Sequence, residues 1–160
     1  MSKIDYVTET QDELFDKAER DLMSIDILCK DTVYPADRKY DIICFNVTQA
    51  VEKYLKGYII ENGKKVKKIH NLAVLLEKAI KIDASFKQIV TECILLNQYT
   101  AEIKYTTRKP ITASDMEKVL SAVKTISNFN HIKTLRDMTS KKQKYEIITQ
   151  ITTNTESEKS

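Results

Sequence analysis

Apolar residues recur every three or four positions through most of the chain, which is the spacing of one face of an α-helix. The longest such pattern covers residues 40–62, where polar residues occupy the other faces. Gly63 follows as a natural helix stop, because glycine takes a positive φ without steric cost. The pattern therefore predicts a long helix that buries one apolar stripe. The stripe consists of Ile43, Val47, Ala50, Val51, Tyr54, Tyr58 and Ile59.

Four further helices are predicted from the same spacing together with residues that favour helix starts. Ser, Thr, Asp and Asn cap the first turn, because their side-chain oxygens accept hydrogen bonds from backbone N–H groups that have no partner inside the helix. A Glu three residues later completes a capping box. With their expected start signals, these helices cover residues 10–30 (Thr10 and Glu13), 72–80 (Asn71), 83–103 (Asp83 or Ser85) and 114–129 (Ser114 and Glu117).

The connections and the chain ends carry different patterns. Residues 31–39 contain Val33-Tyr34-Pro35, and a residue before proline is disfavoured in the α region, so a loop is expected there. We expect residues 1–9 to be a flexible lead and residues 10–132 to be the helical bundle. Residues 133–160 are predicted as an extension, a short docking helix followed by a disordered tail, because the apolar pattern weakens there.

Composition favours an all-α fold. The 160 residues include only two glycines and two prolines, so turns must be rare and helices long. We therefore predict an antiparallel up-and-down bundle of about five helices. A chain of this length buries a sizeable core without a metal ion or a disulfide, and no cofactor is expected.

Charge and cysteine content narrow the function classes. The formal net charge of +3, from 26 basic and 23 acidic side chains, is small for a nucleic-acid-binding domain, so RNA is not a favoured ligand. Cys29, Cys44 and Cys93 are scattered among apolar neighbours and are expected to be buried thiols in a reducing cytosol. The sequence has no zinc-ligand spacing, signal peptide or membrane-spanning run. We expect a soluble, cytoplasmic protein without a metal site.

The polar residues of the long helix, read together with the segment that follows it, resemble the HEPN domain family (higher eukaryotes and prokaryotes nucleotide-binding). The similar positions are Phe45, Gln49-Ala50-Val51-Glu52-Lys53, Leu55-Lys56 and His70-x-Leu72-x-x-Leu75-Leu76. The resemblance extends over residues 10–132 and includes Lys104-Tyr105, where many members have Arg-Tyr-Pro. It implies an all-α bundle that forms a homodimer, with a cleft lined by the 40–62 helix and by residues 104–109.

The resemblance does not extend to the catalytic motif of the family. HEPN domains that act as metal-independent ribonucleases carry an arginine followed, after four to six residues, by a histidine, and both side chains converge on the scissile phosphate. Neither His70 nor His131 has an arginine at that distance before it. The general acid/base pair that metal-free RNA cleavage requires is therefore missing, and we assign no catalytic residue.

The remaining features resemble the HEPN branch that accompanies minimal nucleotidyltransferases. That resemblance implies a non-catalytic protein that binds a nucleotide, or is the partner of a nucleotidyltransferase in a toxin–antitoxin-like module. Lysine and arginine would contact phosphates, and the rings of Tyr99 and Tyr105 would offer a base-stacking surface. The candidate nucleotide- or partner-binding residues are Gln49, Lys53, Lys56, His70, Lys104, Tyr105 and Arg108.

Structural roles compete with each of these assignments. Lys53 and Lys56 also fit a solvated helix face, where Glu52 would pair with Lys56 four residues later. The lysine-rich turn of residues 64–68 is either a solvated hairpin or an edge that attracts phosphate, and His70 is either a ligand or a structural hydrogen-bonding residue. Tyr99 and Tyr105 also suit a core or a dimer interface. Two other functions stay open, a ribonuclease toxin with a non-standard site and a purely structural interaction protein.

Overall fold

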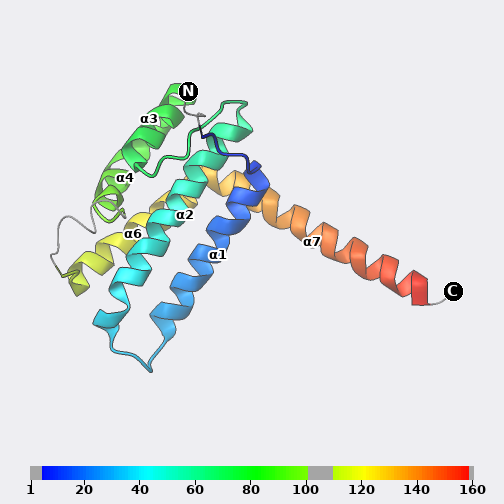
Figure 1. Ribbon diagram of the computed structural model, residues 1–160, viewed down its shortest axis with the longest axis horizontal. Helices are drawn as coiled ribbons and strands as arrows, with labels where there is room; N and C mark the ends of the chain where they lie inside the picture. Colours follow the sequence, from blue (N-terminus) through cyan, green and yellow to red (C-terminus); the bar gives the residue numbers. More distant parts are fainter. Residues whose placement is uncertain (1–4, 101–109, 159–160) are drawn as a thin grey trace.

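The computed structural model describes residues 5–100 and 110–158 of the chain, and these residues confirm the predicted all-α bundle (Figure 1). The described part contains no strand, only one isolated β-bridge. None of its helices combines the length and the apolar character that crossing a membrane requires. The α-helices are α1 (Gln11–Lys30), α2 (Tyr40–Glu61), α3 (Leu72–Ile82), α4 (Val90–Asn97), α6 (Ala113–Asn128) and α7 (Asn130–Glu158), with 3₁₀-helices at Ala36–Arg38 and Ala84–Ile89.

Helix α2 lies at the centre of the bundle. It packs against α1, α3, α4, α6 and the first part of α7. Helices α1 and α2 form a hairpin, and the loop of residues 31–39 connects them (Figure 1). The predicted stripe of α2 is buried, and Tyr54 in its middle is fully inaccessible. The organising role of this helix therefore follows from its apolar stripe, as the sequence predicted.

The hairpin of α1 and α2 is unusually close at Gly57. A methyl group built on this residue would lie 2.6 Å from Cε1 of Phe15, so only glycine fits there without moving the ring. Phe15 in turn meets Tyr54 edge to face, with ring centroids 5.0 Å apart. This close contact fixes the position of α1 against α2.

Most of the predicted helix ends are confirmed. Thr10 accepts a hydrogen bond from the backbone N–H of Glu13, Asn71 accepts from those of Ala73 and Val74, and Gly63 has φ of +74°. The predicted start of α6 is wrong. Its capping box is formed by Thr112 and Asp115, two residues before Ser114 and Glu117, because Thr112 has an extended backbone and α6 begins at Ala113.

The start of the chain is more ordered than predicted, and residues 5–9 are not a free lead. The backbone N–H of Val7 donates to the carbonyl of Val66 at 2.9 Å, and that of Lys68 donates to the carbonyl of Asp5 at 3.0 Å. Val66 is fully buried and anchors the lysine-rich turn to the core. The backbone of this turn is therefore held in place, and the N-terminal residues form hydrogen bonds with it. The expected burial of Cys29 is also wrong, whereas Cys44 and Cys93 are buried.

Two helices differ in extent from the prediction. The fourth predicted helix is a 3₁₀-helix, Ala84–Ile89, followed by α4, and residues 101–103 lie outside the described part. Instead of a short helix and a disordered tail, α7 continues from Asn130 to Glu158. No glycine or proline follows Pro110 to break it. The hydroxyls of Thr152, Thr153 and Thr155 donate to carbonyls four residues earlier, so polar residues that lack a core still fit the helix.

Candidate functional site

Glu52 brings together the two segments that resemble the HEPN family, the polar residues of α2 and the segment that begins at His70. Its Oε1 atom accepts a hydrogen bond from Nζ of Lys56 at 2.7 Å and lies 2.7 Å from Nδ1 of His70. Lys56 is one turn after Glu52 on α2, and His70 comes from the loop that precedes α3. The Glu52 and Lys56 side chains are only 5% and 8% exposed, whereas that of His70 is 58% exposed. The predicted Glu52–Lys56 pair is confirmed, but it is buried.

This cluster fastens a loop to the central helix. A buried carboxylate is stable only when it is paired, and Glu52 has two partners that share one of its oxygens. Because the amine of Lys56 is used inside the protein, it does not offer an open cation to a phosphate. His70 keeps an accessible ring, so it is the one member of the cluster that a ligand could reach without displacing Glu52.

Lys53 points to a different carboxylate. Its Nζ atom lies 2.5 Å from Oδ2 of Asp21 on α1, and both side chains are largely buried. The two candidate lysines of α2 therefore pair with different carboxylates, Lys53 with Asp21 and Lys56 with Glu52. The third candidate on α2, the uncharged Gln49, is partly exposed.

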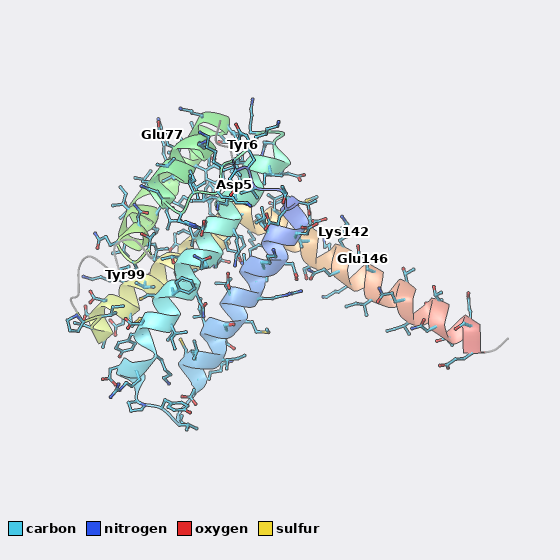
Figure 2. The ribbon with its side chains drawn as sticks, in the orientation of Figure 1. Asp5, Tyr6, Glu77, Tyr99, Lys142 and Glu146 are labelled. Carbon is cyan, nitrogen blue, oxygen red and sulfur yellow. The ribbon has the colours of Figure 1, made fainter. Side chains whose placement is uncertain are left out.

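The other candidate residues give a mixed result. Lys104, Tyr105 and Arg108 lie outside the described residues. Tyr99 is half-buried against the core, and burial, with the nearby Asp115 carboxylate, raises the pKa of its hydroxyl. In the lysine-rich turn, Lys68 pairs with Asp5 at 3.0 Å, next to Tyr6 near the start of the described chain (Figure 2).

A second histidine cluster was not anticipated from the sequence. Nε2 of His131 lies 3.0 Å from Oδ2 of Asp83 and 2.9 Å from Oγ of Ser85, and its ring stacks on Phe86. These are the residue types of a nucleophilic triad, but there the carboxylate and the hydroxyl meet opposite ring nitrogens. Here both meet the same nitrogen. Hydrogen bonds from Ser85 lower the pKa of the Asp83 carboxyl. Asp83 accepts the backbone N–H of Ser85 as the N-cap of the 3₁₀-helix, and His131 is a further partner of this capping carboxylate.

Residues 11–134 match the family model of the HEPN domain. The chain belongs to the HEPN domain family. This family is associated with nucleotides and RNA, and the matched segment includes both Glu52 and His70. No curated protein and no solved structure matches the chain.

The described part of this HEPN domain brings no arginine to a histidine. Arg136 follows His131 by five residues on α7, which is the reverse of the family order, and its guanidinium binds Glu19 and the carbonyl of Ser127 instead. The bond to Glu19 raises the pKa of Arg136. Among the described residues, each of the two histidines has a carboxylate partner, Glu52 for His70 and Asp83 for His131.

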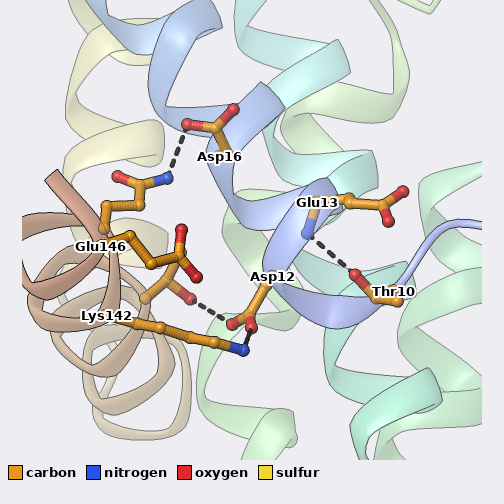
Figure 3. A pocket seen from close by; sticks show the side chains of 8 residues that line it. Thr10, Asp12, Glu13, Asp16, Lys142 and Glu146 are labelled. Atoms are coloured by element: carbon orange, nitrogen blue, oxygen red, sulfur yellow. Dashed lines mark hydrogen bonds and ion pairs between the residues drawn. The ribbon is translucent and has the colours of Figure 1, made fainter. Parts of the chain in front are cut away.

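A cavity of about 330 Å³ lies between the start of α1 and the middle of α7 (Figure 3). Asp12 accepts hydrogen bonds from Thr139 and Lys142, and Gln143 donates to Asp16 at 2.7 Å, so its polar groups already join the two helices. Its acidic lining would repel phosphates. The described residues contain no cluster suited to a metal ion. The cavity is lined by Thr10, Asp12, Glu13, Asp16, Thr139, Lys142, Gln143 and Glu146.

A set of exposed apolar side chains was not predicted from the sequence. Large apolar side chains are exposed on the half of the α1–α2 hairpin nearest its connecting loop, and we call this set the hairpin tip. A signal was present, since several of these residues fall outside the predicted stripes or inside the predicted loop. The hairpin tip consists of Met23, Ile27, Val33, Tyr34, Ile42 and Phe45.

Proposed function

We propose that this HEPN protein is non-catalytic and acts by binding another protein, a nucleotidyltransferase, in a toxin–antitoxin-like pair. The observation that carries the proposal is the hairpin tip, whose apolar side chains are 41–80% exposed. Apolar side chains gathered at one end of a molecule are typical of protein interfaces. The class of partner follows from the resemblance to the nucleotidyltransferase-associated branch of the family.

The charges on α2 favour a protein partner over a nucleotide. A phosphate that recruited Lys53 or Lys56 would leave Asp21 or Glu52 as a poorly solvated carboxylate without its cation, and this carries a large desolvation penalty. The missing arginine–histidine pair likewise argues against RNA cleavage. Nucleotide binding remains the second candidate, through the exposed ring of His70.

A binding experiment tests the role of the hairpin tip. The chain is co-expressed with the nucleotidyltransferase encoded nearest to it in its genome, and the complex is isolated through a tag on the enzyme. Phe45→Glu should weaken the complex at least tenfold, about 1.4 kcal/mol, because it places a charge in the apolar interface. Val74→Glu on α3 is the matched control, since Val74 is 39% exposed against 41% for Phe45. Both variants should melt at the wild-type temperature.

Three results would contradict this proposal. Binding of the enzyme by Phe45→Glu as tight as that of the control would exclude the hairpin tip. Purified protein that cleaves total RNA, with the activity lost in His70→Ala, would restore the ribonuclease alternative. ATP at a hundredfold excess over its Kd would add about 2.7 kcal/mol to the free energy of unfolding of a nucleotide binder. We expect no such gain.

A further inference from the structure

The second half of α7 leaves the bundle. Gln143 bonds to Asp16 and Glu146 lines the cavity against α1, and beyond them the helix projects away from the other helices to Glu158 (Figure 1). Ile147, Ile148 and Ile151 on this segment are 55–62% exposed. An isolated helix with exposed isoleucines is marginal in water, so a packing partner would stabilise it.

Residues 141–158, which include the projecting part of α7, form a series that can pair with a reversed copy of itself. One stripe follows alternating steps of three and four, which is the spacing of a coiled-coil seam. Lysines stand at its start, isoleucines at its centre and a glutamate at its end. About the midpoint between 149 and 150, Ile148 is matched with Ile151, Lys141 with the oppositely charged Glu158, and Lys144 with the neutral Thr155. The stripe is Lys141, Lys144, Ile148, Ile151, Thr155 and Glu158.

We propose that two copies of this chain associate through this segment as an antiparallel coiled coil. In that register Ile148 of each copy packs against Ile151 of the other, and Lys141 faces Glu158 at both ends. A parallel pair would instead place lysine against lysine and glutamate against glutamate, which is unfavourable. The charge order of the stripe thus selects a second copy, in one orientation.

The geometry leaves room for this arrangement. Residues 141–158 span about 27 Å at a rise of 1.5 Å per residue, so the two bundles lie at opposite ends of the paired helices. The segment also lies beyond residue 134, where the family match ends. The interface is therefore separate from the hairpin tip and from the cleft that the family resemblance implies. With few isoleucines in each copy it should be weak and dependent on protein concentration.

Sedimentation equilibrium of the full chain over a concentration series tests the proposal. At each concentration the wild type should have a higher average mass than Ile148→Glu, in which association through this segment should be at least tenfold weaker. Pairing of the bundles through the implied cleft would add equally to both masses. Gln150→Glu adds the same charge on an exposed residue outside the stripe and should associate as the wild type does. A wild type whose average mass equals that of Ile148→Glu at every concentration would overturn the proposal.

Charge reversal tests the orientation. Lys141→Glu and Glu158→Lys should each self-associate less than the wild type, since each places like charges together at both ends. An equimolar mixture of the two variants should form a heterodimer, and the double variant K141E/E158K should recover wild-type association. If neither the mixture nor the double variant associates better than the single variants, the antiparallel register is wrong.

Discussion

At the scale of single residues, Glu52 connects the helix pattern to the loop that follows. The sequence was sufficient to predict its pairing with Lys56, because residues four apart on a helix are neighbours. It could not predict that the pair is buried. Burial depends on the loop of His70 folding over α2, and no local signal reports a contact between residues 18 positions apart.

Removing the Glu52 carboxylate should destabilise the protein strongly. Glu52→Gln leaves the buried amine of Lys56 without its counter-charge, and breaking such a pair costs about 3–5 kcal/mol. The matched control is Glu77→Gln, which disrupts a pair with Lys81 of the same spacing at 3.7 Å, where both side chains are mostly exposed. It should cost less than about 1 kcal/mol. Urea denaturation measures both, and equal losses would show that the Glu52 pair behaves as a surface pair.

At the scale of elements, a helix end could be predicted from the sequence where only one capping or helix-stopping residue was present nearby. Asn71 and Gly63 had no competitor nearby, and both have the expected roles. At the start of α6 two overlapping signals competed, and only the backbone around Thr112 decided between them. The length of α7 was missed for another reason. The sequence shows no core for that segment, but it also contains no residue that stops a helix.

The cap of α6 gives a direct test of this correction. Thr112→Ala removes the oxygen that accepts the N–H of Asp115 and should lower the free energy of unfolding by about 1 kcal/mol. Ser114→Ala should change it by less than about 0.5 kcal/mol, because Ser114 lies in the first turn and alanine is the better helix former. Thermal and urea unfolding of the two variants distinguish the caps. A larger loss for Ser114→Ala would restore the start predicted from the sequence.

At the scale of the whole molecule, Arg136 ties α7 to three other helices. Its Nη2 atom donates to Oε2 of Glu19 on α1 at 3.2 Å, and Nη1 donates to the carbonyl of Ser127 on α6 at 2.9 Å. The hydroxyl of Tyr54 on α2 donates to the same glutamate at 2.7 Å, and its burial raises the tyrosine pKa. Residues 117 positions apart meet here, so no spacing in the sequence could have predicted the contact.

Arg136 should therefore contribute more than an ordinary surface arginine. Arg136→Ala loses its bonds to Glu19 and to the Ser127 carbonyl, at an expected cost of about 1–2 kcal/mol after allowing for the partial exposure of Glu19. Arg136→Lys keeps the charge but not the planar fork that reaches both partners, so it should recover only part of the loss. Arg20→Ala is the control, because Arg20 pairs with Asp16 within α1 and is mostly exposed. Urea unfolding should rank Arg20→Ala, Arg136→Lys and Arg136→Ala in order of increasing loss. Equal values for Arg20→Ala and Arg136→Ala would mean that α7 is held to the bundle by its apolar contacts alone.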